Sequence, residues 1–205
     1  MDGVPVEVEY KFKIPPDIQE RLASINATLA KDITFTDVYL DTTDFVLCCS
    51  DTWLRKRNGK YQLKYAAPDR VKCDVRQYKE TGDEMLIRQH VYRVIAGFNN
   101  TEHSTEHSYD LEQLVPYAEL TTHRLEYEAD QVVIDLDKTD FGYNVGEIEV
   151  VSSCSDDLQS AVEKVQRVAA LLDVQTVDRP ISKLMTYLSV HNKALRDKIY
   201  SLFKF

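Results

Sequence analysis

Charged and apolar residues alternate near the start of the chain in a pattern that is typical of a β-strand. Glu7, Glu9 and Lys11 fall on one face of such a strand, and Val8 and Tyr10 fall on the other. A single strand of this kind could simply turn its charges to water. Several later segments repeat the pattern, some with acidic and some with basic faces. This repetition predicts a sheet that closes around a polar interior.

The strongest turn signal is Asn58-Gly59, which predicts a two-residue hairpin. Such a turn pairs residue 57 with 60, 55 with 62 and 53 with 64, and cross-strand partners share a face. The side chains on that face are those of Trp53, Arg55, Arg57, Gln62 and Lys64. The alternative is an exposed basic hairpin with a stray tryptophan, but Leu54 and Leu63 on the opposite face already supply hydrophobic contacts. Two guanidiniums, an ammonium and an aromatic ring on one surface suit a phosphorylated ligand that carries a ring.

Further strands are predicted over residues 33–42, around 76–80, and over 118–128, 131–138 and 145–152. Their polar faces carry Tyr39, Arg76, Tyr78, Glu80, Arg124, Asp135, Asp137, Glu147 and Glu149. Apolar residues at helical spacing predict helices over residues 18–29, 83–96, 158–172 and 182–203. A further short helix is expected around 110–116, closed by Pro116. We see no linker, so residues 1–205 are expected to form one domain.

Composition restricts the classes of function. The formal net charge is −9, so the chain is a poor non-specific binder of nucleic acid, and no nucleic-acid partner is expected. An anionic ligand would require positive charge that is gathered locally or supplied by metal ions. No stretch is long and apolar enough to cross a membrane, and the first strand leaves no room for a signal peptide, so we expect a cytoplasmic protein. The four cysteines lack metal-site spacing.

The acidic and basic faces together predict a particular chemistry. Packing like charges into one cavity is costly unless the acids hold cations and the bases hold an anion. Clustered carboxylates without soft ligands suit Mg²⁺ or Mn²⁺, and several arginines and lysines suit a polyphosphate. This combination indicates phosphoanhydride chemistry, in which positioning and charge neutralisation supply most of the catalysis.

Several motifs resemble those of the CYTH, or triphosphate tunnel metalloenzyme, family, and the resemblance covers nearly the whole chain. They are Glu7-x-Glu9-x-Lys11, Tyr39 to Thr42, Trp53-Leu54-Arg55-Lys56-Arg57, Leu63-Lys64, Tyr78-Lys79-Glu80, the run from Asp135 to Glu149, and Lys183-Leu184. Two of these motifs, Trp53-Leu54-Arg55-Lys56-Arg57 and the Asp-Phe-Gly-Tyr-x-Val-Gly-Glu-x-Glu block from Asp140 to Glu149, are similar to those of the animal thiamine triphosphatases. The resemblance implies an α+β fold, a closed antiparallel eight-stranded β-barrel (tunnel) with helices packed outside. It also implies Mg²⁺-dependent hydrolysis of thiamine triphosphate to thiamine diphosphate and phosphate.

The resemblance also implies roles for individual residues. The triphosphate would be gripped by Lys11, Arg55, Arg57, Lys64, Arg124 and Lys183, and Trp53 would stack on a thiamine ring. The metal would be held by Glu7, Glu9, Asp135, Glu147 and Glu149. Catalysis would involve Tyr39 and Lys64 in proton transfer, and Glu80 beside the attacking water. The expected partner is therefore a small-molecule triphosphate, and the expected state is a monomer.

Other functions remain open at this point. Lys13 is expected as an extra base on the polar face of the first strand, and a more basic tunnel could accept inorganic triphosphate or nucleoside triphosphates. An adenylyl cyclase is a second alternative, because the same fold supports that activity. A polyphosphate-binding barrel without catalysis is the third.

Overall fold

A computed structural model of the chain describes residues 4–67, 75–99, 108–152, 158–175 and 182–203. The strands are β1 (Val6–Phe12), β2 (Thr28–Asp41), β3 (Thr52–Arg57), β4 (Lys60–Ala66), β5 (Arg76–Thr81), β6 (Val115–Ala129), β7 (Val132–Thr139) and β8 (Asn144–Ser152). The helices are α1 (Ile18–Ser24), α2 (Glu84–Phe98), α3 (Leu158–Leu171), α4 (Lys183–His191) and α5 (Lys193–Phe203), with short 3₁₀ turns η1 (Cys48–Ser50) and η2 (Leu111–Gln113).

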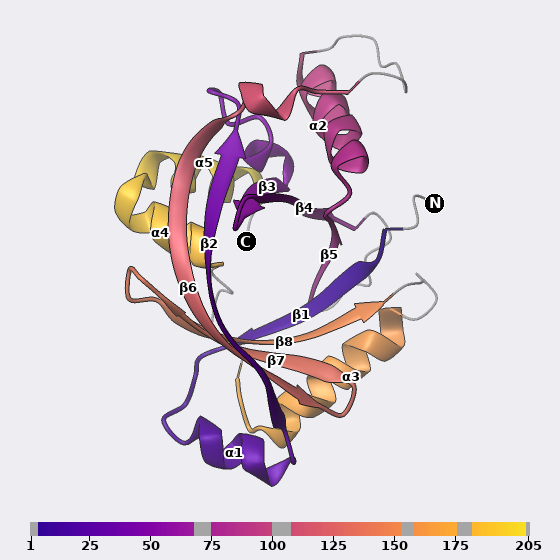
Figure 1. Cartoon of the computed structure of the whole chain (residues 1–205), viewed down its shortest axis with the longest axis vertical. Helices are drawn as coiled ribbons and strands as arrows, with labels where there is room; N and C mark the ends of the chain where they lie inside the picture. The colour runs from indigo at the N-terminus through magenta and orange to yellow at the C-terminus, as the bar shows by residue number, and fades with distance from the viewer. Residues whose placement is uncertain (1–3, 68–74, 100–107, 153–157, 176–181, 204–205) are drawn as a thin grey trace.

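The eight strands close into a barrel in the order β1-β5-β4-β3-β2-β6-β7-β8 (Figure 1). Every pairing between neighbouring strands is antiparallel. The helices lie on the outside of this ring. The predicted closed antiparallel barrel is therefore confirmed.

The β3–β4 hairpin has the register that its turn sequence predicts. Trp53 pairs with Lys64 and Arg57 with Lys60. Asn58 has φ +48° and Gly59 has φ +83°. Two successive left-handed residues are what a two-residue turn needs to match the right-handed twist of its strands. The turn thus fixes which side chains of β3 and β4 face the barrel interior.

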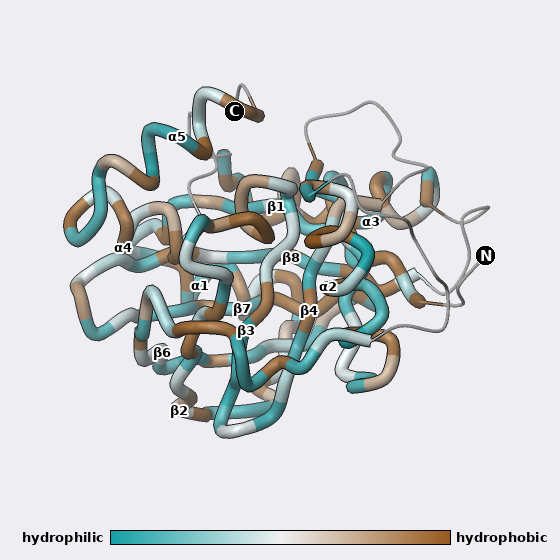
Figure 2. Tube along the Cα trace, turned by 90° about the horizontal axis from the view of Figure 1, so that it is seen from above, coloured by the Kyte–Doolittle hydropathy of each residue, from teal (hydrophilic) through white to brown (hydrophobic). Residues whose placement is uncertain are grey.

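The buried hydrophobic residues of the described chain gather in three clusters, each of which joins strands of the barrel to helices. The first joins Val8, Phe12, Ile134 and Ile148 to residues of α1 and α3. The second joins Ala118 and Leu120 to α4 and α5, and the third joins Leu54 and Leu63 to α2. Figure 2 shows hydrophilic and hydrophobic residues interspersed along the strands. Around the first and third clusters, alternation along the strands places apolar side chains outward, under the helices, and polar ones inward. The second cluster lies on the inner face, because Ala118 and Leu120 pair with Tyr39 and Asp37.

Two helix predictions were wrong at their ends. The helix predicted over 18–29 stops at Ser24, because Asn26 takes a left-handed conformation (φ +56°) and Ala27 N–H donates back to the Leu22 carbonyl. Leu29 consequently lies in β2, where it is 53% exposed. The segment 182–203 forms two helices, since Asn192 interrupts it and its side chain accepts from Leu195 N–H at the start of α5.

Two other expectations also need correction. Pro116 does not close a helix: the helical segment is only the 3₁₀ turn Leu111–Gln113, and Pro116 lies in β6 beside an irregularity in the β2–β6 pairing. Lys13 lies beyond the end of β1 and is exposed, so it is not an extra base on the barrel interior. Of the cysteines, Cys48 and Cys49 are free thiols, while Cys73 and Cys154 lie outside the described residues. Among the described helices, none has both the length and the apolarity to span a bilayer.

Candidate functional site

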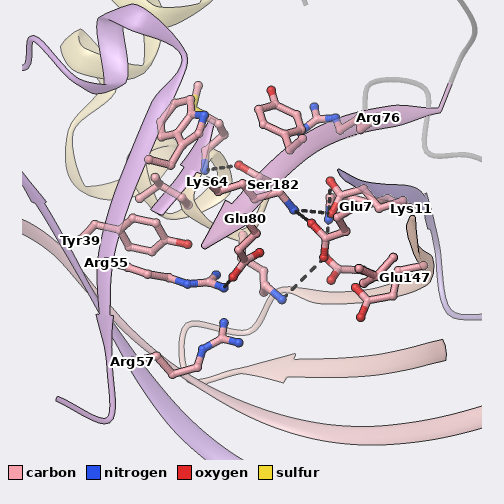
Figure 3. A pocket seen from close by; sticks show the side chains of 18 of the residues that line it. Glu7, Lys11, Tyr39, Arg55, Arg57, Lys64, Arg76, Glu80, Glu147 and Ser182 are labelled. Atoms are coloured by element: carbon pink, nitrogen blue, oxygen red, sulfur yellow. Dashed lines mark hydrogen bonds and ion pairs between the residues drawn. The ribbon is translucent and has the colours of Figure 1, made fainter. Parts of the chain in front are cut away.

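The barrel interior holds a cavity of about 520 Å³. Its walls include seven basic side chains (Lys11, Arg55, Arg57, Lys64, Arg76, Arg124 and Lys183) and five acidic ones (Glu7, Glu9, Glu80, Glu147 and Glu149). Figure 3 shows Tyr39, Arg55 and Arg57 on one side of this space and Glu7, Lys11 and Glu147 on the other. The excess of basic groups contrasts with the net charge of −9 for the whole chain. Positive charge is thus concentrated where an anionic ligand could bind.

Three carboxylates on β7 and β8 form a compact cluster. Asp135, Glu147 and Glu149 can each offer one oxygen so that all three atoms lie within 4.8 Å of one another. Asp135 and Glu147 are direct partners in the β7–β8 register, which explains their proximity. Within the described chain, Asp135 Oδ1 is buried without a hydrogen-bond partner. Hard oxygen ligands and an unsatisfied carboxylate oxygen suit a divalent cation such as Mg²⁺ or Mn²⁺.

Two of the three carboxylates in this cluster have pKa values that reflect crowded negative charge, whereas Lys11, Lys183 and Arg124 outweigh burial and hold the pKa of Glu147 well below its usual value. Burial, together with Glu147 and Asp137, raises the pKa of Asp135 to about 7 although Arg124 opposes the shift. Burial and the neighbouring Glu7 and Asp135 raise the pKa of Glu149 well above its usual value. A bound cation would relieve both effects, because it favours the ionised carboxylates.

Glu7 and Glu9, on β1, border this cluster and form ion pairs with lysines. Lys64 forms ion pairs with both, at 2.9 Å to Glu9, and Lys11 lies 3.3 Å from Glu9. Burial opposes the ionisation of Glu9, but Lys11 and Lys64 lower its pKa to about 2. Five carboxylates were predicted to hold the metal together. Three of them, Asp135, Glu147 and Glu149, form the compact cluster, and the other two, Glu7 and Glu9, lie beside it in ion pairs with Lys64 and Lys11.

A second ionic network surrounds Arg124 on β6. Its guanidinium donates to Asp137 through Nε and Nη2, both at 2.7 Å, and also contacts Asp135 and Glu147. Lys183, the first residue of α4, pairs with Asp137 and lies 3.6 Å from Glu147. Ser182 precedes it as the helix cap, accepting from Met185 N–H. The start of α4 thus delivers Lys183 into the cavity from outside the sheet.

Asp37 on β2 holds the arginines of the β3 face. It is fully buried and accepts two hydrogen bonds from Arg57, at 2.7 and 2.8 Å, and Arg55 Nε lies 3.7 Å away. Arg55 also donates to Glu80 at 2.9 Å. Paired guanidiniums held in a fixed geometry present their remaining N–H groups without a large cost in side-chain entropy.

Tyr39 and Lys64 line the same cavity but contact different groups. Tyr39 lies beside Arg55, its partner in the β2–β3 register, while Lys64 Nζ pairs with Glu7 and Glu9. Burial raises the pKa of Tyr39, and the acidic neighbours of Lys64 outweigh its burial and raise its pKa well above the usual value. Both groups therefore keep their protons near neutral pH.

The structure brings nearly all of the predicted site residues together. Tyr39, Lys64, Glu80, Lys11, Trp53, Arg55, Arg57, Arg124, Lys183, Glu7, Glu9, Glu147 and Glu149 line the cavity. Asp135 is fully buried behind the wall, next to Glu147. Asp37, on the same strand face as Tyr39, was not predicted as a site residue. Phe35, on the same face, and Asp51, in the loop before β3, were also missed.

A closed antiparallel barrel with an ionic interior, a carboxylate cluster and converging arginines defines a tunnel for an anion and its counter-cation. The chain belongs to the CYTH domain family, which it matches over residues 6–180. It is 31% identical to the thiamine-triphosphatases of Macaca fascicularis and Homo sapiens, over 89% of this chain and 84% of each of theirs. The PH1819 protein of Pyrococcus horikoshii shares the fold, with a TM-score of 0.60, 21% identity, and coverage of 90% of this chain and 98% of that one.

Proposed function

We propose that this protein is a metal-dependent triphosphatase that hydrolyses thiamine triphosphate to thiamine diphosphate and phosphate. One observation carries the proposal: a basic wall and two members of the three-carboxylate cluster, Glu147 and Glu149, face the same cavity of about 520 Å³. Family membership and the 31% identity to thiamine-triphosphatases support the choice of reaction and substrate. Residues from Pro5 near the start of the chain to Tyr200 near its end line this cavity, so we infer that the chain acts as a single functional unit.

The metal would be held by Asp135, Glu147 and Glu149. Mg²⁺ is the natural choice for three carboxylates, and Mn²⁺ has similar ligand preferences. When bound, the cation supplies charge neutralisation and a Lewis acid beside the triphosphate oxygens. Glu7 and Glu9 border this cluster, and their role is to keep Lys64 and Lys11 in place.

The triphosphate would lie against Lys11, Arg55, Arg57, Lys64, Arg124 and Lys183. These side chains come from four different strands and one helix start, so the closed barrel is what aligns them. Each cation is already paired with a buried carboxylate, which fixes its direction before the ligand arrives. Such preorganised charge stabilises the charge that spreads over the phosphoryl oxygens in the transition state.

The protonation states limit the roles of the catalytic candidates. Lys64 and Tyr39 hold their protons, so we assign them to donating hydrogen bonds or a proton to phosphate oxygens. The pKa of Glu80 is lowered, because Arg55 and Lys64 outweigh its burial. An ionised Glu80 accepts from Arg55 and has a free face on the cavity that could orient the attacking water.

A substrate panel tests the proposal. Phosphate release is measured from thiamine triphosphate, tripolyphosphate and ATP, each with Mg²⁺ and with EDTA. We expect Mg²⁺-dependent release with the highest kcat/KM for thiamine triphosphate. Equal use of all three would indicate a broad triphosphatase, pyrophosphate and cyclic nucleotide from ATP would indicate a cyclase, and binding without product would indicate a non-catalytic barrel. Each of these three results would overturn the proposed function.

A further inference from the structure

Trp53 and Tyr78 line the cavity and are tied to the same carboxylate oxygen. The Trp53 indole N–H donates to Asp51 Oδ1 at 3.1 Å, and the Tyr78 hydroxyl donates to the same atom at 2.9 Å. Trp53 lies on β3 and Tyr78 on β5, with β4 between them in the barrel. Asp51 itself is not part of the cavity wall. A single acceptor outside the cavity therefore sets the positions of two aromatic side chains inside it.

The loop that carries Asp51 is held rigidly. Asp41, which is 1% exposed, accepts from Leu47 N–H at 2.9 Å and from Cys48 N–H at 2.8 Å. Thr52 N–H then donates to the Leu47 carbonyl at 3.1 Å. Asp51 sits between these anchors in the left-handed region, with φ +52° and ψ +39°. Residues other than glycine rarely adopt this conformation, so the surrounding structure must offset its cost.

The hydrogen bonds of Asp51 also have an electronic effect. An anionic acceptor on the indole N–H makes the ring face more electron-rich, which strengthens its attraction for a cation. Burial and the adjoining Asp51 carboxylate raise the pKa of Tyr78, so its hydroxyl stays a donor. Tyr78 presents its own ring to the Lys64 ammonium, 5.5 Å from the ring centroid. The two rings thus lie between the cationic wall and the loop that bears Asp51.

We infer that Asp51 is a positioning residue that sets substrate selectivity, by holding Trp53 and Tyr78 as a binding surface for the cationic ring of an organic triphosphate. This inference rests on the proposed triphosphatase function and deepens it. Asp51 acts through Trp53 and Tyr78 and has no contact with the phosphate-binding cations among the hydrogen bonds and ion pairs of the described residues. Loss of its carboxylate should therefore weaken recognition of the ring and spare recognition of the triphosphate.

The kinetic test compares Asp51→Ala and Asp51→Asn with wild type on thiamine triphosphate and tripolyphosphate at saturating Mg²⁺. We expect Asp51→Ala to lower kcat/KM for thiamine triphosphate about tenfold, mainly through KM, and to change that for tripolyphosphate less than about twofold. Asp51→Asn keeps an acceptor and should recover part of the loss. Asp44→Asn, an exposed residue in the same loop, is the matched control. Equal losses on both substrates, or no loss on either, would overturn the inference.

A spectroscopic test does not depend on turnover. Trp53 is the only tryptophan in the chain, so intrinsic fluorescence reports on this site alone. We expect Asp51→Ala to shift the emission maximum and to reduce quenching by added thiamine diphosphate, with Asp51→Asn intermediate. Unchanged emission and quenching in Asp51→Ala would overturn the inference, even if wild type hydrolysed neither substrate. Hydrolysis of neither substrate by wild type, with the spectral changes present, would overturn only the proposed function.

Discussion

The guanidinium carbon of Arg57 lies 3.9 Å from the centroid of the Phe35 ring, close enough for a cation–π contact. The Arg124 guanidinium lies on the same ring at 5.4 Å. Phe35 is only 4% exposed, so it forms an apolar spacer behind two cations that would otherwise repel each other. Their separation across the cavity therefore depends on an aromatic side chain that has no direct access to the ligand.

Replacing Phe35 with leucine should impair both arginines at once. We expect kcat/KM to fall about tenfold for thiamine triphosphate and for tripolyphosphate alike, because the contact serves the phosphate end of the substrate. Steady-state kinetics on both substrates provides the measurement. Phe98→Leu, at a position 59% exposed on α2, is the control and should behave as wild type. A loss confined to thiamine triphosphate would show that Phe35 does not serve the phosphate-binding groups.

Trp53→Ala, unlike Phe35→Leu, should affect the two substrates differently. We expect a larger loss of kcat/KM for thiamine triphosphate than for tripolyphosphate, because tripolyphosphate has no ring to stack on the indole. The two substrates are compared in one assay at fixed Mg²⁺. Equal losses for both would count against a stacking role for Trp53.

Asp37→Asn should destabilise the protein in a pH-dependent manner. The pKa of Asp37 is below its usual 3.8 because its hydrogen bonds with Arg57 outweigh its burial. A lowered folded-state pKa stabilises the fold above pH 3.8, and this contribution fades as pH falls through the folded value. We expect Asp37→Asn to lower the free energy of unfolding by about 3 kcal/mol at pH 7, with a smaller difference below pH 4.

Urea unfolding of wild type and Asp37→Asn between pH 3 and pH 7 provides the measurement. The exposed Asp140 is the matched control, and Asp140→Asn should leave the unfolding curve within about 0.5 kcal/mol of wild type. A difference between wild type and Asp37→Asn that stayed constant over the whole pH range would exclude an ionised Asp37 as its source.

Glu149→Gln should stabilise the metal-free protein and remove its response to metal. The pKa of Glu149 is raised by burial and by Glu7 and Asp135, so ionising it costs stability as pH rises above 4.5. At pH 8 in EDTA we expect a higher Tm than wild type. Adding Mg²⁺ should raise the Tm of wild type but not that of the variant, which should also lose Mg²⁺-dependent turnover.

Glu128→Gln, at an exposed position on β6, is the control for this experiment and should keep the wild-type response to Mg²⁺. If Glu149→Gln still gained stability from Mg²⁺ as wild type does, Glu149 would not belong to the metal site.

Gly146 is required where β1 and β8 pair, because it lies directly opposite Phe12. A Cβ added to Gly146 would overlap the Phe12 ring, which is fully buried. We expect Gly146→Ala to lower the free energy of unfolding by about 2 kcal/mol, and adding Phe12→Leu to restore part of it. Gly82→Ala is the control, because the nearest atom to its added Cβ is at 3.8 Å. Chemical denaturation measures all four proteins, and equal stability of Gly146→Ala and wild type would contradict this packing.

The strand faces could be predicted from the sequence because a period of two survives in almost every strand. Asn58-Gly59 predicted the hairpin register correctly, because two successive left-handed residues are typical of a two-residue hairpin turn. The ends of helices were harder to predict. Asn26 and Asn192 end or interrupt helices through single backbone conformations and side-chain caps, which compete with an otherwise continuous apolar stripe.

The contents of the cavity were predictable, but the pairing of its charges was not. Which carboxylates approach one another depends on the β7–β8 register and on how far Lys64 reaches across β5 to β1. No local pattern encodes such contacts between distant segments. Phe35 and Asp51 escaped prediction because their roles are indirect: each orients other side chains and shows only ordinary strand or loop character in the sequence.

Two of the three hydrophobic clusters lie between the outer face of the barrel and its helices. Alternate positions on the strands of these clusters therefore have separate roles. One set packs under the helices and stabilises the fold, and the other set faces the cavity and can bind a ligand. Substitutions at cavity-facing positions can therefore change anion selectivity while the packing that holds the barrel together is retained. The specificity of such a barrel can therefore diversify among related proteins well before the fold changes.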